Sequence, residues 1–91
     1  MAYMLARFGV EDYDAWKERF DTDPIGRRET AKGHRLLRNV DDGNEVFVQL
    51  EFGSVDDAKA FREKLLASGV LDGFEVRTEP TVAEEADTTE Y

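Results

Sequence analysis

His34 is the residue of this chain best suited to proton transfer, because it is the only histidine among the 91 residues. An imidazole titrates near neutral pH and can act as a general base or a metal ligand. If Asp42 and Gly43 form a two-residue turn between two strands, His34 lies directly across from Glu51. A carboxylate there fixes the imidazole tautomer and raises its basicity. The sequence therefore predicts His34 and Glu51 as a candidate catalytic pair, with a simply packed histidine as the alternative.

Three aromatic residues at helical spacing, Tyr13, Trp16 and Phe20, form a candidate wall for a planar ligand. Their spacing places them on one face of a helix. Such a stripe is more often plain core, but both readings can hold, because small pockets are lined by the inner edge of a core. Arg38 and Gln49 are candidates to orient a carbonyl or phenolate oxygen. Hydrogen bonds across a subunit interface explain these two residues equally well.

The composition argues against several other kinds of site. The chain has no cysteine, so it forms no disulfide and offers no thiolate for catalysis or for zinc or iron–sulfur ligation. One histidine and one glutamate supply only two metal ligands, and no third stands at a recognisable spacing. We therefore expect neither a metal nor another cofactor. The net charge of −9 argues against nucleic acid as a partner, since phosphate backbones are bound by clustered Lys and Arg.

The beginning of the chain is predicted to be the first strand of a sheet. Residues 2–8 alternate and are rich in aromatic and aliphatic side chains. They lack the basic region and long apolar core of a signal peptide, and no apolar run reaches the roughly 20 residues of a membrane span. We therefore expect a cytoplasmic protein that does not bind membranes.

The strongest local signal is a hairpin around the Asp42-Gly43 pair, which resembles a type I′ turn and predicts positive φ at Gly43. This turn fixes the pairing of the flanking strands. The predicted cross-strand pairs are Arg38 with Phe47, Leu37 with Val48, Leu36 with Gln49, Arg35 with Leu50 and His34 with Glu51. One face of the later strand is then apolar, with Val46, Val48, Leu50 and Phe52.

Two helical regions surround the hairpin. An amphipathic helix starts at Asp12 and breaks at Asp23, which is predicted to cap a shorter helix that has Pro24 as its first residue and ends at Thr30 or Ala31. Ser54 is predicted to cap a further helix that closes at Ser68 and Gly69. A last strand from Phe74 to Glu79 is expected to end at Pro80.

The predicted element order is β-α-β-β-α-β, which is the arrangement of an α+β ferredoxin-like antiparallel sheet with its helices on one face. Residues 1–80 form one domain, and residues 81–91 are an acidic, mobile tail. The other sheet face stays bare in a monomer and carries apolar side chains. Because a domain of this size buries little surface, we expect a homodimer through this face.

Several segments resemble the small dimeric α+β barrel proteins related to the antibiotic biosynthesis monooxygenases and the stress-responsive barrel proteins, in particular their uncharacterised single-domain members. The segments are 10–17 with Phe20 and Asp21, then 33–38, 41–46 and 50–52, and the resemblance covers residues 2 to about 79. It implies a homodimer whose two sheets pack face to face. It also implies a small cavity in each subunit between the sheet and the helices.

The known activities of that superfamily include cofactor-independent oxygenation of polyketide quinones, haem degradation and isomerisation, and none of them follows from the fold alone. The haem-degrading members carry a histidine on the second helix, whereas residues 55–68 contain none. Three hypotheses remain open. The chain binds a small hydrophobic or aromatic metabolite, or it is a cofactor-independent monooxygenase or isomerase with His34 as base, or it is a structural subunit without a ligand.

Overall fold

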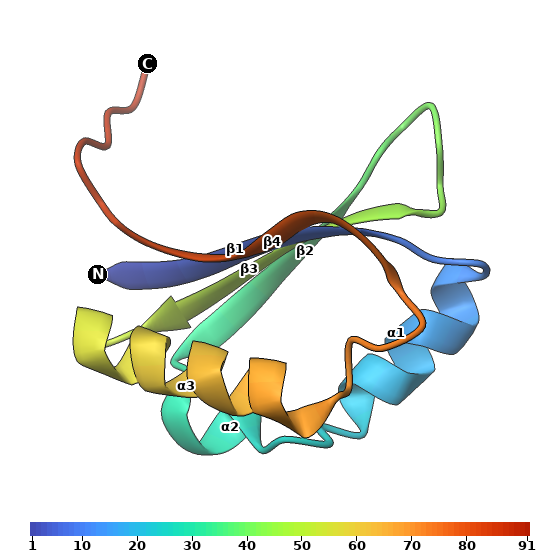
Figure 1. Ribbon diagram of the computed structural model, residues 1–91. Coiled ribbons are helices and arrows are strands. Elements are labelled where there is room, and N and C mark those ends of the chain that lie inside the picture. The colour runs from blue at the N-terminus through green and yellow to red at the C-terminus, as the bar shows by residue number, and fades with distance from the viewer.

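The computed structural model describes all residues 1–91 as an α+β fold with one four-stranded antiparallel sheet (Figure 1). The spatial order of the strands is β2-β3-β1-β4. The strands are β1 (Ala2–Gly9), β2 (Gly33–Arg38), β3 (Glu45–Phe52) and β4 (Glu75–Glu84), and the helices are α1 (Tyr13–Asp21), α2 (Arg27–Thr30) and α3 (Val55–Ser68). This order along the chain agrees with the predicted one, in which α2 is the expected restart of the first helix.

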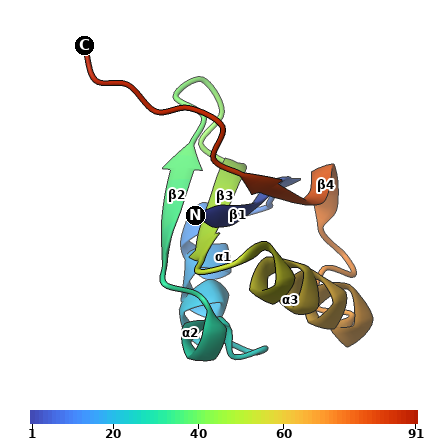
Figure 2. The same ribbon diagram turned by 90° about the vertical axis from the view of Figure 1, so that its left-hand side faces the viewer.

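All three helices lie on the same side of the sheet (Figure 1). Figure 2 shows a strong twist across the sheet, so that the edge strands β2 and β4 run in very different directions. As a result β2 projects beyond the helical layer, and Leu36 is its only residue that is not exposed. None of the helices combines the length and apolar composition that a membrane crossing requires.

Alternate residues of the two central strands build the core. They face the helices and are at least nine-tenths buried: Ala2, Met4, Ala6 and Phe8 on β1, and Val46, Val48, Leu50 and Phe52 on β3. Trp16 of α1 and the α3 residues Ala58, Phe61 and Leu65 complete the cluster. Because successive side chains of a strand point to opposite sides, each strand has one face covered by the helices and one face without them.

We call this second surface the helix-free face. It consists of Tyr3, Leu5 and Arg7 on β1, Arg35 and Leu37 on β2, Phe47, Gln49 and Glu51 on β3, and Thr81 and Ala83 on β4. Leu5 and Leu37 are exposed on it, while Tyr3 and Phe47 are half-buried. The expected bare sheet face thus exists, although the residues that β2 contributes to it differ from those predicted.

The ends of α1 and α3 follow local signals that the sequence carries. The carboxylate of Asp12 accepts a hydrogen bond from the backbone N–H of Asp14 at 3.1 Å, and the hydroxyl of Ser54 accepts one from Asp57 at 3.1 Å. Gly69 ends α3 with a φ of 75°, in the left-handed region that glycine adopts without strain. The predicted ends of α3 at Ser54 and Gly69 are therefore confirmed, and Asp12, where the first helix was expected to start, caps α1.

The second helix begins later than predicted. Asp23 is not the residue before α2, and Pro24 does not start it, because a turn closed by the Gly26 N–H on the Asp23 carbonyl (3.1 Å) comes first. Asp23 still satisfies this helix end with its side chain, which accepts from the backbone N–H groups of Arg27 at 2.8 Å and Arg28 at 3.3 Å. The carboxylate caps the helix from a distance and holds the turn in place.

The loop between β2 and β3 is longer than the predicted two-residue turn. It spans residues 40–44 and is closed by the Asn39 N–H, which donates to the Glu45 carbonyl at 3.1 Å. Two side-chain turns shape it: Asn39 accepts from the Asp41 N–H at 2.8 Å, and Asp42 accepts from the Asn44 N–H at 3.1 Å. These local bonds compete successfully with a type I′ turn. Gly43 accordingly lacks the positive φ that we expected.

The longer loop shifts the register of the hairpin by one residue. His34 lies opposite Leu50 instead of Glu51, and all five predicted cross-strand pairs are wrong. The observed pairs are His34 with Leu50, Arg35 with Gln49, Leu36 with Val48, Leu37 with Phe47 and Arg38 with Val46. A shift of one residue moves every side chain of the strand to the opposite face. The side chains of His34, Leu36 and Arg38 therefore belong to the helix-covered face.

Strand β4 continues past Pro80, where we expected it to end. Thr81–Glu84 pair with β1, and Pro80 is buried in a stretch where irregularities interrupt the pairing. Proline donates no hydrogen bond but is accommodated at such bulges and on edge strands. The residues 81–84, which the sequence assigned to the tail, are thus part of the sheet, and only residues 85–91 follow it without helix or strand.

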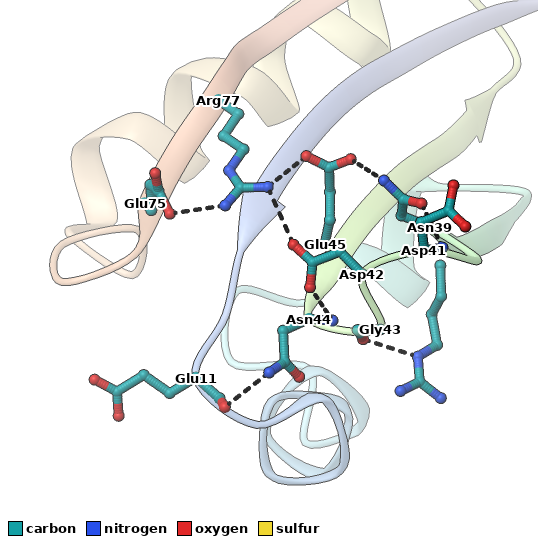
Figure 3. A network of polar contacts seen from close by, with 10 residues as sticks. Glu11, Asn39, Asp41, Asp42, Gly43, Asn44, Glu45, Glu75 and Arg77 are labelled. Carbon is teal, nitrogen blue, oxygen red and sulfur yellow. Dashed lines mark hydrogen bonds and ion pairs between the residues drawn. The ribbon is translucent and has the colours of Figure 1, made fainter.

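A polar network connects the hairpin loop with β4 (Figure 3). The Glu45 carboxylate is 8% exposed and accepts hydrogen bonds from Asn39 Nδ2 at 3.0 Å and from Arg77 Nη1, while Arg77 Nη2 donates to Glu75 at 3.1 Å. Glu45 and Glu75 flank Gly9 of the strand between them. A Cβ atom at Gly9 would lie 2.5 Å from the Glu75 carboxylate. Because Gly9 has no side chain, the Arg77 side chain can cross β1 at this position and link β4 to Glu45 of β3.

The extension of β4 leads to a prediction about truncation. Removal of residues 81–91 deletes the last part of the β1–β4 pairing and the packing of Val82, so we expect the thermal unfolding midpoint to fall by more than about 4 °C, or roughly 1 kcal/mol for this size. Removal of residues 86–91 alone keeps the strand and should shift the midpoint by less than about 2 °C. Calorimetry or circular dichroism measures both. Equal midpoints for the two truncated chains would contradict the pairing of residues 81–84.

A second prediction concerns pH. The hydrogen bond from Asn39, followed by that from Arg77, lowers the pKa of Glu45 from its usual value. The network therefore stabilises the fold above that usual pKa and loses its effect as pH falls through the lowered one. Glu45→Gln should destabilise the chain at pH 7, and the difference from wild type should shrink as the pH approaches 3. Urea unfolding measures it, with Glu63→Gln on the exposed side of α3 as control, and a pH-independent difference would contradict the role of the charge.

Candidate functional site

The predicted aromatic stripe is present on α1 and faces the sheet. The rings of Trp16 and Phe20 are stacked, with centroids 5.1 Å apart and 27° between their planes, and Tyr13 lies 6.1 Å from Trp16. Trp16 is buried, whereas the other two rings are half-buried. The helical spacing therefore correctly predicted a common face, which here covers β2 and β3.

The shifted hairpin register brings two predicted strand residues to this stripe. The imidazole of His34 meets the Phe20 ring edge to face, with centroids 5.1 Å apart and an interplanar angle of 83°. The guanidinium carbon of Arg38 lies 4.1 Å from the centre of the Tyr13 ring, and its Nε donates to the Gly43 carbonyl at 3.0 Å. Four aromatic or imidazole rings and one guanidinium group thus form a continuous layer between α1 and β2.

Glu51 and Gln49 do not belong to this layer. Both lie on the helix-free face, where Glu51 is opposite Tyr3 and Gln49 is opposite Leu5. The predicted pair of His34 and Glu51 is therefore wrong, because the two side chains point to opposite sides of the sheet. Arg38 and Gln49 are separated in the same way, so they do not act together on one ligand atom.

The environment of His34 favours the neutral imidazole. Partial burial lowers the pKa of His34 from its usual value, and the positive charges of Arg27 and Lys17 lower it further, against the opposite effect of Asp21. The residue as a whole remains exposed on the projecting strand β2. A neutral imidazole at pH 7 is able to accept a proton, but no carboxylate fixes its tautomer as the sequence had suggested.

A cavity of about 280 Å³ lies between the sheet, α1, α3 and the segment that leads into β4. Its walls are formed by Met4, Phe8, Trp16, Arg19, Phe20, Thr22, Asp23, Pro24, Ile25, Arg27, Val48, Leu50, Phe61, Leu65, Val70, Leu71 and Phe74. Most of these side chains are apolar, so the cavity suits a hydrophobic ligand. Trp16 and Phe20 are the only predicted site residues in its wall. Tyr13, His34 and Arg38 pack behind or beside them.

The polar part of this wall is centred on Arg27, which is only 5% exposed. Its Nη1 donates to the Phe20 carbonyl at 2.6 Å and to the Asp23 carboxylate at 3.1 Å. Its guanidinium carbon lies 3.6 Å from the centre of the Phe20 ring. Burial lowers the pKa of Arg27, and the charge of Asp23 acts in the opposite direction. The side chain remains a cation at neutral pH, since an arginine in a protein keeps its proton.

The sequence analysis missed Arg27 and most of the cavity wall. One signal was available, because Asp23 and Arg27 stand four residues apart and can pair on one side of a turn. The burial of Arg27 depends on how the turn after α1 brings its side chain back to the Phe20 carbonyl, which local spacing does not specify. The wall residues Val48 and Leu50 were predicted to lie on an apolar strand face, but not to line a cavity.

No three metal-ligating side chains come together anywhere in the chain. A comparison of the chain with models of known families and with curated proteins finds no match.

Proposed function

We propose that the chain is a small homodimeric α+β barrel protein that binds a small hydrophobic or aromatic metabolite. The single observation that carries this proposal is the apolar cavity of about 280 Å³ between the sheet and the helices. Ligand pockets commonly measure about 300–1,000 Å³, so this cavity suits a ligand at the small end of the range. The stacked Trp16 and Phe20 offer a planar group a flat apolar surface.

The strand order supports the barrel part of the proposal. The β-α-β-β-α-β order along the chain and the spatial order β2-β3-β1-β4 both support a ferredoxin-like sheet. Dimeric α+β barrels form when two such sheets pack face to face. The resemblance of residues 2 to about 79 to that superfamily fits this arrangement, and the oligomeric state is the property that tests it.

The helix-free face supports a second copy of the chain as its partner. Leu5 and Leu37 are exposed there beside Tyr3 and Phe47, which no helix covers. The face carries positive charge at Arg7 and Arg35 and negative charge at Glu51, so a two-fold pairing that sets Arg35 against the partner's Glu51 joins opposite charges. Residues 85–91 also leave the sheet on the side away from the helices (Figure 1). A small domain gains stability from the additional burial.

A catalytic function has less support than binding. A cofactor-independent monooxygenase or isomerase with His34 as base was the alternative, but Glu51 lies on the other face and His34 is not part of the cavity wall. A neutral imidazole beside Phe20 is the one feature that favours it. The third alternative, a structural subunit, requires that the cavity bind nothing.

The dimer is tested by a matched pair of leucines. Leu37 on the helix-free face is 53% exposed, and Leu66 on α3 is 54% exposed. We expect Leu37→Glu to convert a two-chain species into single chains, because a buried unpaired charge opposes the interface, whereas Leu66→Glu leaves the dimer intact. Light scattering after size exclusion measures the mass. A wild-type mass of one chain at micromolar concentration would contradict the dimer, as would dissociation caused by both variants equally.

Binding in the cavity is tested with a neutral planar probe, 2-naphthamide. Trp16 is the only tryptophan, so its single indole N–H signal in a nitrogen-15 NMR spectrum reports on the cavity wall directly. We expect a saturable shift of this signal, with a dissociation constant below ~1 mM. Leu71→Phe fills the cavity and should weaken binding, whereas Leu66→Phe on the outside should not. No saturable shift in the wild type would favour a structural subunit.

A further inference from the structure

We propose that the cavity selects small carboxylic acids, and that Arg27 holds the carboxylate through its Nε and Nη2 N–H groups. This inference rests on the proposed binding function and adds the chemical class of the ligand. It starts from two buried atoms of Arg27, Nε and Nη2, which have no hydrogen-bond partner in the protein. The apolar part of the ligand occupies the cavity beside Trp16 and Phe20.

The two unpaired nitrogens form one edge of the guanidinium plane. The N–H of Nε and one N–H of Nη2 point in the same direction and are spaced to meet both oxygens of a carboxylate. The other terminal nitrogen, Nη1, is already occupied by the Phe20 carbonyl and Asp23. The internal contacts of Arg27 thus use one end of the group and leave its two-pronged edge free. A planar anion with two oxygens fits this edge better than a single hydroxyl or carbonyl does.

The orientation of this edge is fixed by packing on two sides. The guanidinium carbon lies 3.6 Å from the centre of the Phe20 ring, and the Phe20 ring is itself stacked on Trp16. The bond from Nη1 to the Phe20 carbonyl at the end of α1 prevents rotation. A group held in this way loses little conformational freedom when it binds an anion. The same stack places the Arg27 side chain beside an apolar aromatic surface.

Leaving these two nitrogens without a hydrogen-bond acceptor is unfavourable. A buried donor without a partner has lost its hydrogen bond to water and gained nothing in return, and the penalty is larger on a cation. Both nitrogens are sealed from solvent in this conformation. A carboxylate therefore reaches them only after a local rearrangement of the packing around Arg27, which is common at binding sites. The contact it then makes satisfies both donors at once.

The surroundings of Arg27 are basic in an otherwise acidic chain. The whole sequence has 12 Lys and Arg against 21 Asp and Glu. Arg27 is the only residue shared by the cavity and a second cavity of about 220 Å³, which is lined by Arg28, Ala31, Lys32, Gly33 and His34. Among all residues of the two linings, Arg19, Arg27, Arg28 and Lys32 are cationic, and Asp23 is the only acid. The excess of cations in the two linings thus favours an anion at their boundary, and Asp21, which lies outside the linings but also acts on Arg27, opposes part of this effect.

The test compares two ligands of nearly equal shape, 2-naphthoate and 2-naphthamide, at pH 7. The acid is ionised at this pH and the amide is neutral. We expect the wild-type chain to bind 2-naphthoate at least about tenfold more tightly than 2-naphthamide, because only the carboxylate forms hydrogen bonds with Arg27 in which both groups are charged. The Trp16 indole signal and calorimetry both measure the dissociation constants. Equal affinities would overturn the selection of carboxylic acids and leave the proposed binding function standing, whereas no binding of either ligand would overturn both.

Variants of Arg27 test whether this residue causes the preference for 2-naphthoate over 2-naphthamide. Arg27→Met removes the charge and the free edge, so 2-naphthoate should lose its advantage while 2-naphthamide still binds. Arg62→Met on α3, which lines neither cavity, controls for the loss of one positive charge and should keep the full preference. If Arg27→Met does not fold, Arg27→Lys retains a cation without the two-pronged edge and should still reduce the preference severalfold. A preference unchanged in the Arg27 variant that folds would overturn the assignment.

Discussion

The number of residues in the loop between β2 and β3 determines the chemistry of both faces of the sheet. Because the loop spans residues 40–44, His34 and Arg38 face the helices, and Leu37 faces away from them. A loop one residue shorter or longer would reverse all these directions. The side chains of Asn39 and Asp42 hold that length by bonding to backbone N–H groups within the loop. The aromatic layer and the bare face of the sheet both depend on these two short polar side chains.

The features predicted correctly are those in which a few neighbouring residues supply the whole physical cause. Asp12 and Ser54 satisfy the first N–H groups of their own helices, and Gly69 adopts a backbone conformation that other residues disfavour. The wrong predictions involve competition or distant partners. At Asp42 and Gly43 a two-residue type I′ turn competes with a longer loop. The Asn39 side chain, which lies outside this pair, stabilises the longer loop by accepting from the Asp41 N–H. At Pro80 the strand continues because pairing with β1 is irregular there, which no local signal reveals.

The candidate site shows the same division between local and distant causes. Helical spacing predicted that Trp16 and Phe20 share a face, and the structure places both in the cavity wall. The burial of Arg27 could not be predicted, because a short helix of mostly charged residues usually lies in solvent. Here α2 folds back so that the guanidinium group reaches the carbonyl of Phe20 at the end of α1. One side chain thereby closes a helix end and places a positive charge in an apolar wall.

The position of β1 in the sheet has a consequence for how the chain folds. Strand β1 lies between β3 and β4 in the sheet, and β4 follows it along the chain only after every other helix and strand described here. Residues 2–9 can therefore complete their hydrogen bonds only after residues 75–84 have been made. Pairing between such distant segments must close a long loop before it gains any energy, which slows folding. During synthesis one edge of β1 therefore stays unpaired until residues 75–84 have been made.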